Sequence, residues 1–159
     1  MWKKVMFGVL LVSVVGSADY RAFALQAGGV EIGDLETGSV VGQPFKELPV
    51  DLEIYAADLG NLKIIYPPTS VLDMKTRGGR PVVIKVTNRS SIDRGFLMTA
   101  DGAFEAPTVL RAQLVLKPGE TKYIGIPTSD LLYATSGSTF VYKDHLHPSG
   151  AEGKLLILR

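Results

Sequence analysis

The sequence predicts an all-β domain, a sandwich or barrel built from short strands. Three observations indicate this class. Short apolar or alternating stretches recur along the chain after residue 50. Turn-forming pairs such as Asp101-Gly102 and Pro118-Gly119 separate them. No long stretch has the spacing of an amphipathic helix. Regularly spaced short strands with turn residues between them are typical of β-sandwiches and β-barrels.

Each expected strand is bounded by a turn signal. Residues 50–55 alternate between apolar and polar side chains, 62–66 form a short apolar run, and 82–86 are β-branched. β-branched side chains pack well on a pleated sheet. Residues 129–134 predict one helical turn, with Ser129 or Asp130 as its cap. The remaining predicted strands are residues 96–99, 111–116, 123–126, 139–142 and 154–158.

The first residues have the pattern of a secretory signal peptide. A positively charged start precedes an almost unbroken apolar run over residues 5–15, and residues 22–24 (Ala-Phe-Ala) supply small side chains for cleavage before Leu25. The apolar run is well short of the ~20 residues that cross a bilayer. We expect residues 1–24 to be removed and the mature protein to lie in the periplasm or outside the cell. Membrane attachment through an uncleaved segment is the alternative.

The remaining chain divides into a Gly-rich leader segment, residues 25–47, and one domain, residues 48–159. The leader has little periodicity, and the sequence leaves open whether it folds onto the domain. Without residues 1–24 the chain carries 14 basic and 15 acidic side chains. This balance argues against a nucleic-acid partner, which needs a basic face. The tightest basic cluster, Lys75, Arg77 and Arg80, is interpreted as a solvated turn rather than an anion site.

The chain contains no cysteine. An exported domain can use disulfides, but a chain without cysteine cannot form them. This domain must therefore be held together by its hydrophobic core alone. The absence also excludes thiolate-ligated copper, iron–sulfur clusters, covalently attached haem and cysteine-rich zinc sites. Met74 and Met98 are expected to pack in the core or at its edge rather than to form a copper site.

Several motifs occur in an order that resembles the cupredoxin family, in particular amicyanin and plastocyanin. Tyr66-Pro67-Pro68 precedes a Gly-rich turn and a strand that ends in Asn88-Arg89, and Pro118-Gly119-Glu120 forms a later turn. A strand over residues 139–142 then leads into Asp144-His145-Leu146-His147-Pro148 and a final apolar strand. The resemblance covers about residues 48–159. It implies a cupredoxin-like Greek-key β-sandwich or barrel of about seven to eight strands.

Copper in that family is held by two histidines, a cysteine and an axial methionine. Matched by position in this sequence, the first histidine is replaced by Arg94 and the cysteine by Asp144. The second histidine is retained as His147, and Gly150 and Ala151 occupy the region of the methionine. The resemblance therefore implies a cupredoxin scaffold that lacks a blue-copper site. We hypothesise that Arg94 and Asp144 form a charge-assisted pair in the vacated site.

Two interpretations of the only histidines, His145 and His147, remain open. If the segment is extended, both rings lie on one side and could chelate copper in an open, non-blue site, with Asp144 or Glu152 as oxygen ligands. Otherwise they are polar residues of an exposed loop before Pro148. In the first interpretation the cofactor is copper, although nickel or zinc could bind in the same way, and the second interpretation requires no cofactor.

No nucleophile motif or pair of catalytic carboxylates is visible, so we expect no enzymatic activity. The leading hypothesis is an exported binding or accessory module, with another periplasmic protein as its partner. The resemblance suggests that this partner belongs to a redox or copper-handling system. A periplasmic copper carrier that uses His145 and His147 is the first alternative, and a structural assembly domain is the second.

Overall fold

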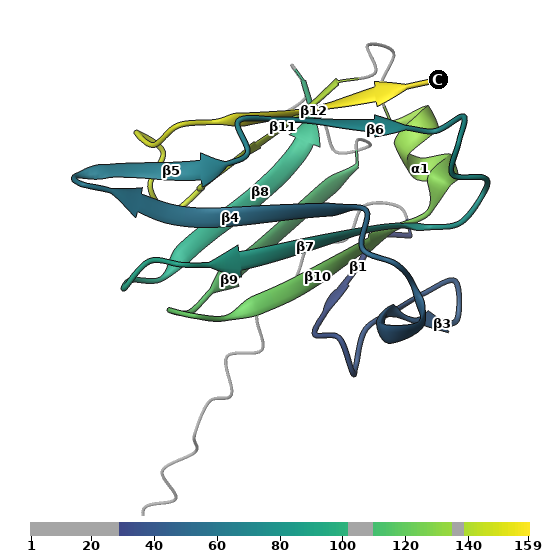
Figure 1. The fold of residues 1–159 in the computed structure, drawn as a ribbon, viewed down its shortest axis with the longest axis horizontal. Helices are drawn as coiled ribbons and strands as arrows, with labels where there is room; N and C mark the ends of the chain where they lie inside the picture. The colour runs from purple at the N-terminus through teal and green to yellow at the C-terminus, as the bar shows by residue number, and fades with distance from the viewer. Residues whose placement is uncertain (1–28, 102–109, 135–138) are drawn as a thin grey trace, which may run out of the picture.

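Two β-sheets face one another in the computed structural model, which describes residues 29–101, 110–134 and 139–159 (Figure 1). The predicted signal peptide lies outside these residues. Within them each sheet has five strands. In spatial order the first sheet contains β1 (Glu31–Gly33), β10 (Thr121–Ile126), β7 (Val82–Asn88), β4 (Leu52–Leu59) and β5 (Leu62–Tyr66). The second contains β6 (Thr69–Asp73), β12 (Gly153–Leu158), β11 (Thr139–Lys143), β8 (Arg94–Ala100) and β9 (Arg111–Leu116).

The all-β sandwich predicted from the sequence is confirmed, and all eight expected strands are present. β4 pairs with β7 and β6 pairs with β12 in parallel, whereas the other neighbours within the two sheets are antiparallel. β1 and β6 were not predicted. β6 directly follows Pro67 and Pro68, which were interpreted as the end of a strand, and the chain crosses to the other sheet at this point.

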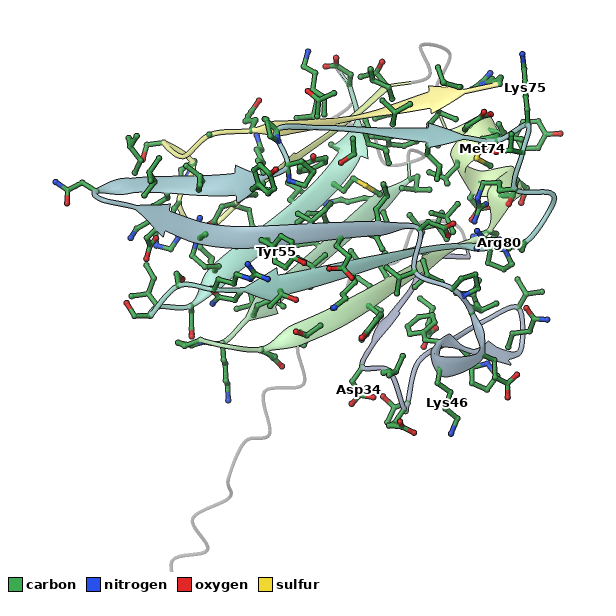
Figure 2. The ribbon with its side chains drawn as sticks, viewed as in Figure 1. Asp34, Lys46, Tyr55, Met74, Lys75 and Arg80 are labelled. Carbon is green, nitrogen blue, oxygen red and sulfur yellow. The ribbon has the colours of Figure 1, made fainter. Side chains whose placement is uncertain are left out.

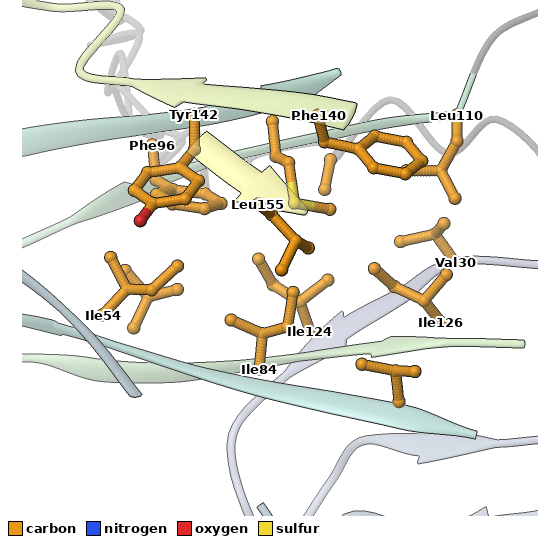
Figure 3. Packing of buried hydrophobic residues seen from close by; sticks show 14 of the residues in the cluster. Val30, Ile54, Ile84, Phe96, Leu110, Ile124, Ile126, Phe140, Tyr142 and Leu155 are labelled. Carbon is orange, nitrogen blue, oxygen red and sulfur yellow. The ribbon is translucent and has the colours of Figure 1, made fainter. Parts of the chain in front are cut away.

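The hydrophobic core lies between the two sheets, where the inward-facing side chains of both meet (Figure 3). Ile84 and Ile124 come from the first sheet, and Phe140 and Leu155 come from the second. Full burial of such a side chain contributes roughly 1.5–3 kcal/mol. Met98 is buried in this core, which confirms that it packs there.

The leader segment folds onto the first sheet from residue 29 onward. β1 pairs with β10, and Val30 joins the core. A short hairpin and a 3₁₀ turn (Phe45–Glu47) follow, and bury Val40 and Phe45 against Gly125 of β10. A Cβ at Gly125 would lie 1.7 Å from Val40 Cγ2 and 2.5 Å from Phe45 Cε1. The question that the sequence left open is therefore answered for residues 29–47, which extend the sandwich.

The hairpin of the leader contains a strained turn. β2 (Ser39–Val40) and β3 (Gln43–Pro44) are joined by Val41 and Gly42, whose φ angles are +53° and +78°. Two-residue turns with both φ values positive favour Asn-Gly, and a β-branched residue is strained there.

Val41→Asn is expected to raise the free energy of unfolding by about 1 kcal/mol, because asparagine tolerates the left-handed conformation and Val41 is 78% exposed. Urea denaturation of the two proteins measures this difference. Gly42→Ala is the matched control and should change stability in the opposite direction. A lower urea midpoint for Val41→Asn would contradict this description of the turn.

The predicted helical turn is present as α1 (Thr128–Tyr133), but the predicted caps are wrong. The helix begins earlier than expected, with Pro127 at the N-cap position and no side-chain cap. Ser129 and Asp130 consequently lie inside the first turn, where Ser129 Oγ and Gly29 N both donate to the Asp130 carboxylate. Among the residues that the structure describes, no helix is long and apolar enough to cross a membrane.

The basic cluster is only partly the solvated turn that the sequence suggested. Lys75 is exposed, but the Arg77 side chain is only 5% exposed and donates to Asp51 Oδ2 at 2.7 Å. Arg80 donates to the other oxygen of the same carboxylate at 2.6 Å. Arg77 is therefore a buried, paired residue and not part of a solvated turn. The reason is that Asp51 immediately precedes β4, and the pairing of β4 with β7 brings the Asp51 carboxylate to the turn before β7.

Candidate functional site

Arg94 enters the space between the sheets at the first position of β8. Side chains alternate across a strand, and Phe96, Met98 and Ala100 of the same strand all belong to the core. The same alternation turns Arg94 inward, and its side chain is fully buried. A permanently charged guanidinium in this position needs hydrogen-bond partners for its donors, since burial of an unpaired charge is costly.

The Arg94 guanidinium is held on three sides. Nε donates to Asp144 Oδ2 at 2.5 Å, which confirms the predicted contact between these residues. Nη1 donates to Ala57 O at 3.0 Å and to Asp58 Oδ1 at 3.1 Å, and Nη2 donates to Ile64 O at 3.2 Å. The guanidinium therefore ties β8 to the β4–β5 hairpin and to the segment that follows β11. We call Arg94, Asp144 and these partners the Arg94 clasp.

Asp144 accepts hydrogen bonds at both carboxylate oxygens. Oδ1 receives the backbone N–H groups of Gly95 at 2.8 Å, Leu146 at 3.0 Å and His147 at 3.3 Å. Oδ2 receives Arg94 Nε and, at 2.9 Å, His147 Nδ1. Burial raises the pKa of Asp144, but the hydrogen bonds from Arg94, His147 and the backbone outweigh burial and hold the pKa below its usual value of 3.8. The group is thus an ionised acceptor.

The His145 ring lies against Gly95, the second residue of β8. A Cβ at Gly95 would lie 2.6 Å from His145 Nδ1 and 2.8 Å from Asp144 Oδ1, so only glycine leaves room for both side chains. Burial lowers the pKa of His145, and Arg111 adds to this effect while Asp144 opposes it. The neutral imidazole is therefore favoured at this position.

The segment that carries the histidines is not extended. β11 ends at Lys143, and residues 145–150 form bends and a turn. The assumption that placed His145 and His147 on one side is therefore wrong. Glu152, the second candidate oxygen ligand, lies 3.7 Å from Lys143 Nζ and is half exposed. No group of three or more His, Cys, Asp or Glu side chains that could hold a metal ion exists among the described residues. Metal binding by the two histidines stays a prediction.

The residues at this site do not fit a blue-copper centre. Arg94 presents only N–H donors and a permanent positive charge at the position that the resemblance assigns to a histidine ligand. Asp144 stands at the cysteine position, and its oxygens already accept five hydrogen bonds. A cation at this point would meet the guanidinium charge and would have to displace these donors.

Sequence reasoning identified Arg94 and Asp144 but missed their partners on the β4–β5 hairpin. Two of those partners are the backbone carbonyls of Ala57 and Ile64, and every residue carries such a group. The third, Asp58, also contacts Lys63 Nζ at 3.0 Å across the hairpin. These groups are partners of Arg94 because the β4–β5 hairpin lies beside the start of β8. No pattern in the sequence indicates this position of the hairpin.

Comparisons with known proteins found similarity in structure alone. No family model and no curated protein matches the sequence. Auracyanin B has a TM-score of 0.50 at 14% identity, covering 70% of this chain and 92% of that one. Auracyanin from Roseiflexus castenholzii has a TM-score of 0.48 at 16% identity, over 68% and 96%. A purple cupredoxin from Nitrosopumilus maritimus has a TM-score of 0.45 at 13% identity, over 67% and 99%.

The two facing sheets and the likeness to auracyanin B define the class: this is a β-sandwich with the cupredoxin fold. The particular molecule differs from the copper-binding pattern of that fold, because it has no cysteine and holds Arg94 against Asp144. Identity at this level shows the fold and does not transfer a function.

Proposed function

We propose that this chain is an exported, non-catalytic binding or accessory module on a cupredoxin scaffold, associated with a periplasmic redox or copper-handling system. The observation that carries the proposal is the fully buried Arg94 guanidinium, hydrogen-bonded to Asp144. Arg94 and Asp144 stand at the positions that the resemblance assigns to two metal ligands. Their contact joins β8 to the segment after β11, as a metal ion would join the segments that carry its ligands.

The Arg94 clasp supports a structural rather than a chemical role for this end of the sandwich. It joins β8, the β4–β5 hairpin and the segment after β11. Ala151 N also donates to Lys63 O at 3.1 Å, which fastens that segment to β5. A buried charge pair satisfied in this way fixes one arrangement of the loops, and none of its groups can accept or donate an electron.

Exposed apolar side chains beside the clasp support a binding role. Leu59 and Leu62 face each other at the end of the β4–β5 hairpin, and each is 64% exposed. Leu146, whose backbone N–H donates to Asp144, is also exposed. Large apolar side chains gathered at one end of a domain favour contact with a protein partner. The signal-peptide pattern and near-neutral charge are compatible with a periplasmic protein partner.

Calorimetric titration of the mature chain with Cu(II), and with Cu(I) under anaerobic conditions, tests this function. We expect no saturable one-to-one binding and no change in melting temperature at one equivalent of copper, because the charged groups at the site already satisfy one another. Saturable one-to-one binding that raises the melting temperature would contradict the proposal.

One observation favours the copper-carrier alternative. Asp144 is ionised and lies 2.9 Å from His147 Nδ1, so this nitrogen donates and Nε2 is left as the acceptor. A carboxylate that fixes an imidazole in this tautomer is typical of metal-binding histidines. In this alternative, His147→Ala abolishes copper binding and His145→Ala weakens it. Equal weak binding by the unaltered protein and both variants would reject it.

A further inference from the structure

A groove of about 520 Å³ lies at the opposite end of the sandwich from the β4–β5 hairpin. Its lining includes Val41 of the leader hairpin, Arg80 and Pro81 before β7, and Pro127 and Ser129 at the start of α1. Figure 2 labels Arg80 at this end, beside the start of β7. Thr128 Oγ1 donates to Arg80 O at 2.8 Å and thereby fixes the turn to the helix. The volume is within the range of sites that hold small ligands, about 300–1,000 Å³.

The turn beside the groove holds two arginines that share one carboxylate. Asp51 is the carboxylate partner of both Arg77 and Arg80, and it also accepts from Val83 N at 2.9 Å. Two permanent cations thus share one anion. Asp51 and Arg77 are almost completely buried, whereas the Arg80 side chain is 35% exposed and lines the groove. Arg80 donates to Asp51 through Nη2 at 2.6 Å and through Nη1 at 3.3 Å. A guanidinium has five N–H groups, so three of them remain for another acceptor.

The nearest acidic group beside the groove is already engaged. Asp130 accepts from Gly29 N at 2.6 Å and from Ser129 Oγ at 3.1 Å. Both donors are neutral, so Asp130 keeps its negative charge, and its two oxygens bind the leader and the first turn of α1. Among the ion pairs of the described residues, Asp51 is the acid that Arg80 contacts. An incoming anion would complete the charge balance of the arginine pair.

The other wall of the groove is apolar and includes a strained residue. Val41 is 78% exposed and has a φ of +53°, and Pro81 and Pro127 line the same space. A β-branched side chain held in the left-handed region at a groove is the kind of strain that favours a binding role. A ligand that matches both walls has a negative group for Arg80 and an adjoining apolar group for Val41.

We propose that this groove binds the C-terminal carboxylate of a partner polypeptide whose last side chain is apolar. Arg80 receives the carboxylate through a two-point hydrogen-bonded ion pair, and the last side chain packs against Val41 and the two prolines. A peptide terminus supplies both groups at adjacent positions, which inorganic anions do not. The inference rests on the proposed role as a binding module and adds the chemistry of the partner.

The test is an NMR titration of the ¹⁵N-labelled mature chain with acetyl-Gly-Gly-Leu as the free acid and as the amide. The free acid should give saturable shifts of the backbone amides around Val41, Arg80 and Ser129. Binding of the amide should be weaker by about tenfold or more, because the charged hydrogen bonds to Arg80 are lost. Arg80→Gln should weaken binding of the free acid by a similar factor. Lys75→Gln removes a charge from the same turn without touching the groove and should leave binding unchanged.

Three results would overturn the inference. They are equal binding of acid and amide, an undiminished affinity in Arg80→Gln, and shifts of the same amides by inorganic phosphate alone at equal affinity. Arg77 stays paired with Asp51 in Arg80→Gln, so the fold should persist. If that variant does not fold, Arg80→Lys keeps the charge but loses the two-point contact and should still weaken binding severalfold. None of these results depends on copper, so failure here is distinguishable from failure of the proposed function.

Discussion

Replacing Arg94 by leucine is expected to lower the free energy of unfolding by about 3–5 kcal/mol. The substitution leaves Asp144 buried without its guanidinium partner, and it leaves Ala57 O and Ile64 O without the donors that they have now. Breaking one side of a buried charge pair costs far more than losing an exposed pair. Urea denaturation followed by circular dichroism measures the change.

Lys63→Leu is the matched control for Arg94→Leu. Lys63 pairs with Asp58, which is also a partner of Arg94, but the side chains of this pair are 29% and 27% exposed. A partly exposed ion pair contributes up to about 1 kcal/mol. A loss in Arg94→Leu no larger than the loss in Lys63→Leu would contradict the buried, fully hydrogen-bonded clasp.

The effect of Arg94→Leu should also depend on pH. In the unaltered protein the pKa of Asp144 is below 3.8, so its stabilising contribution is present at neutral pH and is lost as the pH falls through that lowered pKa. In Arg94→Leu the guanidinium no longer opposes the effect of burial, so the pKa of Asp144 rises. Protonation of Asp144 at lower pH then removes a buried charge. The stability difference between the two proteins should therefore narrow from pH 7 to pH 4. A difference that stays constant would contradict this assignment.

Phe45→Ala is expected to lower the free energy of unfolding by about 3–5 kcal/mol, the usual cost of removing a buried phenylalanine. Phe45 is fully buried and contacts the positions of Gly38 and Gly125, both of which lack a side chain there. The cavity cannot be filled by these glycines. Thermal and urea unfolding of the two proteins measure the loss.

The neighbouring exposed residue provides the control for Phe45→Ala. Lys46 makes a solvent-exposed ion pair with Glu36, so Lys46→Ala should change stability by no more than about 0.5 kcal/mol. If Phe45→Ala had an equally small effect, the leader would not be an integral part of the sandwich.

The strands that the sequence predicted are those with a strong local pattern. β7 alternates or runs apolar over its whole length. β1 is short and lies in a Gly-rich segment, which gives it a weak local pattern. Its pairing with β10 depends on Gly125, which leaves room for Val40 and Phe45. This requirement concerns residues far apart in the chain, and local patterns do not contain it.

The part of the candidate site that could be predicted is the part that depends only on the spacing of residues along the chain. The positions of Arg94 and Asp144 relative to the family pattern predicted their contact, and the structure confirms it. The arrangement of His145 and His147 was not predictable, because it depends on whether the chain bends after β11. Asp144 itself promotes that bend by accepting the backbone N–H groups of Leu146 and His147.

Arg94 and Asp144 are expected to act as one unit that ties β8 to the segment after β11. A double-mutant cycle of Arg94→Leu and Asp144→Asn, measured by urea denaturation at pH 7, tests it most directly. The asparagine side chain retains an oxygen for the backbone N–H groups of Gly95 and Leu146, so the cycle isolates the charge pair. We expect a coupling energy of about 1.5–3 kcal/mol. Additive effects of the two substitutions would contradict it.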